Sequence, residues 1–139
     1  MKMTQQQIID FFHANTVIDF MEIEVVPTPD GEARLELTPD IRHANLHLMA
    51  HGGMLTLMAD TAMGAKCLAL NKRVVTISMM IEFMRAIKVG TRIMTDARVL
   101  HDGQRTMVCE CRIVDATGKL YAKADATFFV TGKFIDDES

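Results

Sequence analysis

The chain has 139 residues, of which 49% are apolar and 24% charged, which suits one well-filled core and is too little for two ordinary domains. We therefore expect a single domain over residues 1–139. The net charge of −3 hides an asymmetry, because residues 1–65 hold three Lys and Arg against nine Asp and Glu, whereas residues 66–112 hold nine against four. A basic segment in an acidic protein argues against nucleic-acid binding and suits a small ligand with several phosphates, although a mixed solvated surface fits the charges equally well.

The sequence also indicates the cellular compartment of the protein. The polar N-terminal residues do not form the apolar run of a signal peptide, and no stretch reaches the roughly 18 apolar residues of a membrane span. We expect a cytoplasmic protein with no membrane partner. Cys67, Cys109 and Cys111 are an odd count, and the last two alternate along one predicted strand, so we expect reduced thiols that pack in the core.

The first predicted element is a short amphipathic helix within residues 1–15, for which Thr4 can serve as the N-cap. Residues 20–26 and 32–37 then alternate apolar and polar side chains. Between them, the Pro-Asp-Gly sequence at 29–31 has the composition of a tight turn. This pattern predicts a β-hairpin.

A predicted loop over residues 38–50 precedes a helix over about residues 53–70, whose apolar side chains leave almost no polar face. Such a helix is normally buried. Four strand-like segments follow, separated by short turns that contain glycine: 74–84, 91–100, 106–114 and 120–130. One buried helix and six strands predict an α+β fold, in which a long antiparallel sheet curls around a central helix. The acidic end of the chain, 133–139, is expected to fray.

Asp60 stands two turns inside this apolar helix, where an unpartnered carboxylate is costly. It is either a structural acid that hydrogen-bonds a neighbouring loop or a functional acid that faces a cavity. The other residues on its side of the helix, at steps of three and four, are small or polar: Gly53, Thr56 and Gly64. They leave space beside the carboxylate, which favours the functional interpretation.

The start of the same helix offers free backbone N–H groups and the positive end of the helix dipole. Gly52 and Gly53 let a ligand approach this backbone closely. The two glycines can also simply form the turn from loop to helix. Together with an acid two turns further on, they favour a site that stabilises negative charge on a reacting oxygen.

Three histidines, His43, His47 and His51, recur at intervals of four, which resembles metal-ligand spacing on a helix. Because this segment is predicted to be a loop, the spacing has no special geometry there. We expect no metal; His51 is expected to orient the turn by hydrogen bonding, and His43 and His47 to be surface or loop residues. There is no Ser-centred nucleophile elbow, no phosphate-binding glycine loop and no dinucleotide fingerprint.

Part of the sequence resembles the signature of the hotdog-fold acyl-coenzyme A thioesterases of the phenylacetic acid degradation subgroup: Asn45, His51-Gly52-Gly53, Asp60 and Gly64. The resemblance continues through residues 76–85 and 88–90 and covers about residues 15–131. It implies a hotdog fold and hydrolysis of an acyl- or aryl-coenzyme A thioester, with no metal or organic cofactor.

By this resemblance, Asp60 is the catalytic carboxylate, the Gly52 N–H forms the oxyanion hole and Asn45 orients the thioester. Thr76 positions the attacking water, and His51 lies beside the hole. The resemblance also implies a homodimer, often paired into a tetramer, in which one subunit supplies the carboxylate and the other the glycine turn. Whether the carboxylate activates water or attacks the thioester directly stays open.

Coenzyme A carries phosphates, which gives the basic segment a use. Four cations near predicted strand ends or turns are expected to bind them, with Gly53 also contacting the substrate: Arg73, Arg85, Lys88 and Arg105. Four methionines either line the acyl pocket or belong to the core: Met54, Met58, Met79 and Met80.

Two positions depart from the family pattern, which commonly has a glycine where this chain has Leu48 and a proline where it has Ala86. Leu48 is expected to alter the loop before the oxyanion hole. Two alternatives to a thioesterase stay open: a non-catalytic acyl-coenzyme A-binding hotdog protein, and another hotdog enzyme such as a dehydratase. The acyl group cannot be read from the sequence, because pocket shape determines it.

Overall fold

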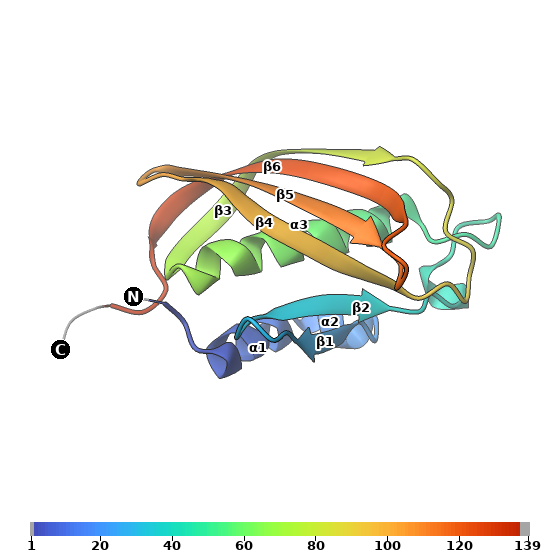
Figure 1. The fold of residues 1–139 in the computed structure, drawn as a ribbon, viewed down its shortest axis with the longest axis horizontal. Coiled ribbons are helices and arrows are strands. Elements are labelled where there is room, and N and C mark those ends of the chain that lie inside the picture. Colours follow the sequence, from blue (N-terminus) through green and yellow to red (C-terminus); the bar gives the residue numbers. More distant parts are fainter. Residues whose placement is uncertain (1, 137–139) are drawn as a thin grey trace.

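The computed structural model describes residues 2–136 and folds them into three α-helices, one short 3-10 helix and a six-stranded sheet (Figure 1). Along the chain, the elements are α1 (Gln5–Ala14), α2 (Thr16–Phe20), β1 (Glu24–Pro27), β2 (Ala33–Leu37), η1 (Ile41–His43), α3 (Gly52–Ala69), β3 (Lys72–Phe83), β4 (Ile93–Asp102), β5 (Thr106–Val114) and β6 (Leu120–Lys133).

The sheet curls around α3 and is antiparallel throughout, with its strands in the order β1-β2-β4-β5-β6-β3. In Figure 1, β3 to β6 arch over α3, whereas α1, α2 and the β1–β2 hairpin lie below it. Three buried residues of β6, Ala122, Ala124 and Ala126, have small side chains, and α3 can therefore pack closely on this part of the sheet. The predicted α+β arrangement is confirmed.

α3 matches the helix predicted over 53–70 to within one residue at each end. The residues in its middle that face the sheet lie in the core: Leu55, Met58, Ala59, Ala62 and Met63. The expectation that α3 is buried all round is wrong for the single chain, because Gly53 is exposed and Thr56 and Asp60 are only half-buried. This open side lies beside β3, the last strand of the sheet among residues 2–136.

The N-terminal segment contains one element that the sequence pattern did not predict. α1 has the expected cap, because the Thr4 hydroxyl accepts a hydrogen bond from the Gln7 N–H and the Gln7 side chain accepts one from the Thr4 N–H. The chain then forms α2, so the strand predicted over 20–26 is wrong at its start, and β1 begins only at Glu24. Complete burial of Ile18 in the core stabilises this short helix over the extended conformation that the alternation favoured.

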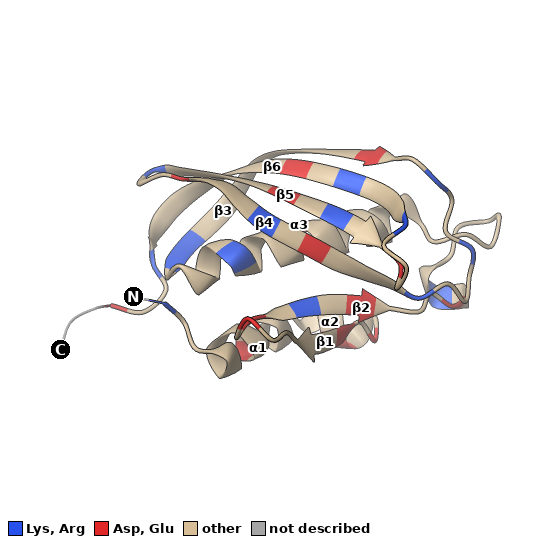
Figure 2. Cartoon of the chain, viewed as in Figure 1, with Lys and Arg blue, Asp and Glu red and all other residues tan. Residues whose placement is uncertain are grey.

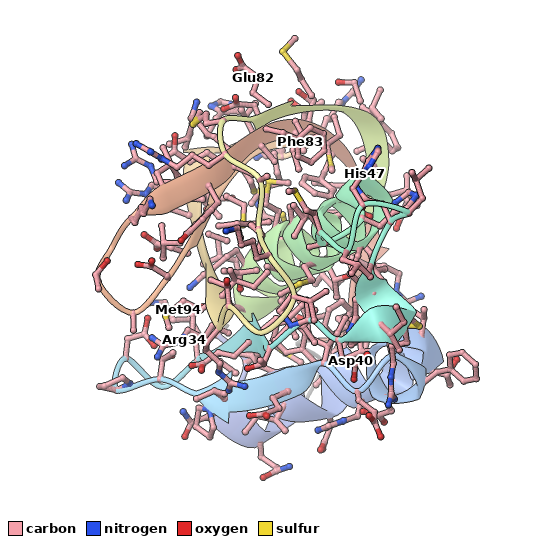
Figure 3. The ribbon with its side chains drawn as sticks, turned by 90° about the vertical axis from the view of Figure 1, so that its right-hand side faces the viewer. Arg34, Asp40, His47, Glu82, Phe83 and Met94 are labelled. Carbon is pink, nitrogen blue, oxygen red and sulfur yellow. The ribbon has the colours of Figure 1, made fainter. Side chains whose placement is uncertain are left out.

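A β-bulge at Ile77 interrupts β3. Thr76 and Ser78 oppose consecutive residues of β6, so Ile77 has no partner on that strand. The bulge changes which side chains face α3, from even positions such as Thr76 before it to odd positions such as Phe83 after it. Figure 3 shows Phe83 directed toward the helix and its neighbour Glu82 directed away from it.

The end of the chain is anchored where a frayed tail was expected. The Asn71 side chain donates a hydrogen bond to the Ile135 carbonyl (2.7 Å) and accepts one from the Ile135 N–H (2.8 Å). The Phe134 ring meets Phe11 of α1 edge to face, with 6.5 Å between centroids. The expected fraying over 133–139 is therefore wrong at 133–135, because apolar side chains there pack on the body of the protein, while residues 137–139 lie outside the described residues.

The three cysteines are free and buried, as predicted. Burial raises the pKa of the Cys111 thiol to about 12, and the hydrogen-bonding contact with Cys109, followed by burial, raises that of Cys67. Neither thiol is a ready nucleophile at neutral pH. None of the helices within residues 2–136 combines the length and apolar character needed to cross a membrane.

Candidate active site

Asp60 and Thr76 form a hydrogen-bonded pair on the open side of α3. The Thr76 Oγ1 donates to Asp60 Oδ1 over 2.8 Å. Asp60 is half-buried and Thr76 exposed, so the carboxylate is not enclosed in apolar surroundings as the sequence pattern indicated. No other hydrogen bond or ion pair to the Asp60 side chain is found within the described part of the chain. A carboxylate and a hydroxyl in this arrangement can hold one water molecule and take its proton.

Two clefts meet at this pair, which lines both of them. The first, of about 240 Å³, runs along α3 toward the end of that helix. Its apolar lining comes from Phe11, Gly64, Leu68, Val74, Phe128 and Phe134. Besides Asp60 and Thr76, its polar lining comes from Asn15, Thr61, Lys72 and Arg73. The second, of about 410 Å³, runs toward the start of α3: Gly53, Thr56, Leu57, Met79 and Ile81. The small side chains predicted along this side of the helix therefore border open space.

The turn at the start of α3 leaves one N–H group available to a ligand. His51 is the N-cap residue, and its Nδ1 accepts a hydrogen bond from the Gly53 N–H (2.8 Å). The Gly52 N–H is the first of the helix and has no acceptor among residues 2–136. A Cβ on Gly52 would lie 3.1 Å from the Phe83 ring, so glycine fits closely here. Gly52, not Gly53, thus offers the N–H that can stabilise an oxyanion.

The loop before α3 is organised by Asn45, whose Oδ1 accepts hydrogen bonds from the N–H groups of His47 (2.8 Å) and Met49 (3.2 Å). Between them, Leu48 has a φ of 61°, in the left-handed region that favours glycine. The departure from the family pattern at this position therefore costs about 1–2 kcal/mol of backbone strain, while the turn still forms.

Within one chain, the Gly52 N–H and the Asp60 carboxylate cannot act on the same atom. They are eight residues apart on α3, or about 12 Å along the helix axis. Asn45, Gly52 and Arg85 line a third cleft, of about 340 Å³, which Asp60 does not reach. The structure brings Asp60 and Thr76 together, and Asn45 and Gly52 together, but keeps the two pairs apart.

The four cations expected at the phosphates are also divided. Arg73 and Arg105 lie on either side of the last residues of β6. Arg85 and Lys88 follow the far end of β3, whose 12 residues span about 40 Å. Figure 2 shows positively charged segments at both ends of the sheet. One chain therefore cannot bring all four to one phosphate group.

The three histidines do not gather around a metal position. Among residues 2–136, no group of three or more His, Cys, Asp or Glu side chains is arranged to hold an ion. His43 is not at the surface but buried, because its Nε2 donates to the Met21 carbonyl (2.7 Å) and its Nδ1 accepts from the Asp40 N–H (3.0 Å). His47 and His51 are exposed.

Of the four methionines, for which a pocket and a core role both stayed open, one lines a cleft beside Asp60. Met58 is buried in the core, Met80 points to solvent, and Met79 lines the second cleft. Instead, the first cleft has aromatic walls from Phe11 and Phe134. The sequence did not indicate them, because they come from opposite ends of the chain and no spacing rule connects them.

A family model described as "Thioesterase superfamily" matches residues 48–122. The chain belongs to this superfamily. Its relatives include the acyl-coenzyme A thioesterase PaaI of Escherichia coli, which is 30% identical over 100 residues, or 72% of this chain and 71% of PaaI. The solved structure of E. coli PaaI, from the phenylacetic acid degradation operon, aligns with 96% of this chain and 100% of its own, at 25% identity and a TM-score of 0.82. The hotdog fold is thereby confirmed.

Two similar streptococcal structures hold coenzyme A ligands. A Streptococcus mutans protein bound to acetyl CoA is 27% identical, with a TM-score of 0.74, and covers 80% of this chain and 90% of its own. A hypothetical thioesterase of Streptococcus pneumoniae with coenzyme A is 27% identical, with a TM-score of 0.73 and the same coverage. It was also solved as two alanine variants, of an aspartate and of a threonine 16 positions further on. Asp60 and Thr76 are also 16 positions apart.

Proposed function

We propose that the chain hydrolyses acyl-coenzyme A thioesters, with Asp60 as the catalytic carboxylate. The observation that carries this proposal is the 2.8 Å hydrogen bond from Thr76 to Asp60, at the point where two clefts meet. The pair places a base, the Asp60 carboxylate, next to a hydroxyl that can bind water, and both are accessible from the clefts. The equal spacing of the aspartate and threonine varied in the S. pneumoniae thioesterase supports the assignment.

The site is completed, in this proposal, by a second copy of the chain bound along β3. β3 ends the sheet and exposes apolar side chains along its length, including Val75 (54% exposed), Ile77 (56%) and Met80 (65%). A long apolar edge strand is a template for pairing with another strand. Two-fold symmetry would pair the two copies of β3 antiparallel.

Antiparallel pairing would bring together the two pairs of residues that one chain keeps apart, Asp60 with Thr76 and Asn45 with Gly52. Gly52 lies against Phe83 at the end of β3, whereas Asp60 lies against Thr76 nearer its start. Running two copies of β3 in opposite directions therefore brings Gly52 of the partner subunit toward Asp60. In the same way it brings the cations that follow one β3 toward Arg73 of the other, where together they can bind the coenzyme A phosphates.

The reaction then needs three groups. The N–H of the partner subunit's Gly52 donates to the thioester carbonyl oxygen and stabilises the negative charge that develops there. A water molecule held by Thr76 loses a proton to Asp60 as its oxygen attacks the carbonyl carbon. The carbon–sulfur bond breaks, and the coenzyme A thiolate takes the proton back from Asp60. Asn45 supports this geometry by holding the turn that presents the N–H.

Direct attack by Asp60 would instead form a mixed anhydride, which water then hydrolyses. A single turnover in heavy-oxygen water distinguishes the routes. Water attack puts the label only into the released acid, whereas hydrolysis of the anhydride at the aspartyl carbon leaves label in the Asp60 carboxylate, where mass spectrometry of the peptide detects it.

The central test is a thiol-release assay on Asp60→Asn beside a matched control. We expect Asp60→Asn to lower kcat by at least about a hundredfold, because it keeps the shape and removes the base. Asp125→Asn changes a half-buried acid on β6 whose carboxylate pairs with Lys123, away from the clefts, and should stay near the unaltered rate. Near-normal turnover by Asp60→Asn would refute the assignment, and coenzyme A binding without turnover by the unaltered protein would favour a binding module.

Complementation tests the shared site. Gly52→Pro removes the N–H at the first helical position, where the backbone accepts proline, although the Phe83 ring must shift to admit the new Cβ (3.1 Å). Circular dichroism checks that the variant folds, and it and Asp60→Asn should each be nearly inactive alone. In co-expressed mixed dimers, one of the two sites has both an intact Asp60 and an intact Gly52. Activity of about a quarter of the unaltered level is then expected for random pairing. No recovery in verified mixed dimers would refute a site built from two subunits.

A further inference from the structure

The lining of the first cleft is neither purely apolar nor purely polar. Phe11, Phe128 and Phe134 give it aromatic surface, while Asn15 and Thr61 add uncharged polar groups. Such a lining does not suit a long aliphatic chain, because its polar groups would lose water without gaining hydrogen bonds. It suits a flexible ligand in which amide groups alternate with hydrocarbon segments.

Two polar side chains in this cleft have hydrogen-bonding capacity left for a ligand. The Asn15 Nδ2 donates to the Phe11 carbonyl (2.8 Å), but in the described part of the chain nothing donates to its Oδ1. The Thr61 hydroxyl has no protein partner within residues 2–136, whereas the Thr56 hydroxyl on the same helix donates to the Gly52 carbonyl (2.8 Å). An acceptor and a donor can therefore bind the N–H of one amide and the carbonyl of another.

The cleft also contains two cations, of which one is available to a ligand. Lys72 pairs with Asp102 and donates to the Gly103 carbonyl (2.8 Å). Arg73 has no acidic partner among residues 2–136; it is exposed, and its guanidinium lies 5.5 Å from the Phe134 ring centroid. The ring holds the guanidinium in place without neutralising its charge. A phosphate at this end of the cleft would therefore meet an ordered cation.

The length of the cleft matches the part of coenzyme A that joins its thiol to its first phosphate. From Asp60 to Leu68 the cleft follows α3 for eight residues, about 12 Å. From Thr76 to Arg73 it follows β3 over about 10 Å. The arm of coenzyme A, pantetheine, has about 13 bonds between sulfur and phosphorus and spans about 15 Å when extended. With the thioester at Asp60, the first phosphate therefore reaches just past the end of the cleft, beside Arg73.

Phe134 is held in place by a residue that does not line the cleft. Asn71, which is buried and has a φ of 60°, makes two reciprocal hydrogen bonds with the Ile135 backbone. These bonds fix the segment that follows β6 against the turn between α3 and β3. Because they adjoin Phe134 directly, they restrict where its ring and the guanidinium beside it can lie.

We propose that the first cleft holds the pantetheine arm of coenzyme A, with the thioester at Asp60 and the first phosphate at Arg73. The inference rests on the proposed thioester hydrolysis. Phe11 and Phe134 pack on the dimethyl carbon of the arm, which lies next to the first phosphate, and the free acceptor and donor bind its amides. Asn71 is a positioning residue that acts through Phe134. The acyl group lies on the other side of the catalytic pair, outside this cleft.

The first test uses butanoyl thioesters of three thiols of increasing length: N-acetylcysteamine, pantetheine and coenzyme A. The first reproduces only the start of the arm, the second reproduces all of it, and the third adds the phosphates. Phe134→Ala should lower kcat/KM on the order of tenfold for the pantetheine and coenzyme A thioesters, because it removes an apolar contact of that worth. It should leave the N-acetylcysteamine thioester unchanged.

Two other variants locate the effect along the arm. Arg73→Gln should lower kcat/KM for the coenzyme A thioester alone, since the other two thioesters lack phosphates. Phe129→Ala is the matched control. Phe129 is 45% exposed, against 40% for Phe134, but it lines none of the clefts beside Asp60 or Gly52, so all three thioesters should react at the unaltered rate.

Asn71→Gly keeps the inference testable if Phe134→Ala does not fold. Glycine tolerates the positive φ but loses both bonds to Ile135, so the pantetheine and coenzyme A thioesters should react more slowly and the N-acetylcysteamine thioester should be spared. A purely structural role would impair all three. Binding of desulfo-coenzyme A, which lacks the sulfur atom, gives the same comparison by calorimetry without turnover.

The outcomes separate this inference from the proposed function. If the unaltered protein releases no thiol from any thioester, the thioesterase proposal fails, while weaker binding of desulfo-coenzyme A by Phe134→Ala would still support the arm site. If Phe134→Ala spares the coenzyme A thioester, or impairs all three thioesters equally, the inference is overturned. It is equally overturned if Phe134→Ala changes the preference among acyl groups but not the binding of desulfo-coenzyme A, because the cleft then holds the acyl group.

Discussion

Replacing Gly64 by alanine should make the protein more stable. Gly64 lies in the interior of α3, where glycine is less favourable than alanine by about 0.5–1 kcal/mol. The new methyl group would meet no heavy atom within 4 Å, so no clash offsets this gain. The free energy of unfolding should rise by about 0.5–1 kcal/mol, which corresponds to about 2–4 °C in Tm.

Gly53→Ala provides the contrast. It lies in the first turn of the same helix, but its Cβ would fall 3.0 Å from the His51 Nδ1 that caps the helix. Displacing this ring removes a cap worth about 0.5–2 kcal/mol, so the Tm should fall. The same change of residue in one helix should therefore have opposite signs at the two positions.

Thermal unfolding of both variants at one protein concentration is the assay, because the stability of an associating protein depends on concentration. A lower Tm in Gly64→Ala would refute the reasoning, since it would mean that another surface covers this side of α3 in solution.

Three further predictions concern single side chains. Thr76→Val keeps the shape but loses the donor to Asp60 (2.8 Å), so kcat should fall about tenfold to a hundredfold with little change in Tm; an unchanged kcat would remove Thr76 from the site. Thr95→Val leaves the buried Leu35 N–H without its acceptor (3.1 Å), so the free energy of unfolding, measured with denaturant, should fall by about 1–3 kcal/mol. An unchanged free energy of unfolding would mean that the strands rearrange to pair this N–H. The hydroxyl and N–H of Thr117 and nearby donors lower the pKa of Asp115 to about 2 from 3.8, so its contribution to stability is complete above pH 3.8 and is lost as pH falls through about 2. The stability difference between the unaltered protein and Asp115→Asn should shrink over that range, and a difference independent of pH there would contradict it.

Local pattern predicted those parts of the fold whose determinants are close together in the sequence. The Thr4 cap, the hairpin turn at 29–31 and the bounds of α3 follow from neighbouring residues, and the structure has all three. The helix α2 was missed, because burial of Ile18 against distant parts of the chain decides it. The anchored residues 133–135 were missed for the same reason.

The sequence predicted the candidate site to a similar extent. The spacing placed Asp60 on a small, polar side of α3 and beside open space, which the structure has. It could not show that Asp60 is half-buried in one chain, or that Gly52 has an unoccupied N–H while that of Gly53 is used by the cap. The burial of Asp60 depends on which side of α3 the sheet leaves open, and the use of the Gly53 N–H depends on the conformation of the His51 side chain. Residue spacing predicts neither.

The bulge at Ile77 limits how the length of this chain can change in evolution. Loss of this single residue would restore regular pairing with β6, but it would turn either Thr76 or the later half of β3 to the opposite face of the sheet. The hydroxyl beside Asp60 and the packing of Phe83 on Gly52 are both satisfied only with the extra residue between them. Relatives that keep both features should therefore accept insertions and deletions in the outer loops, but none between the threonine and the phenylalanine of this strand.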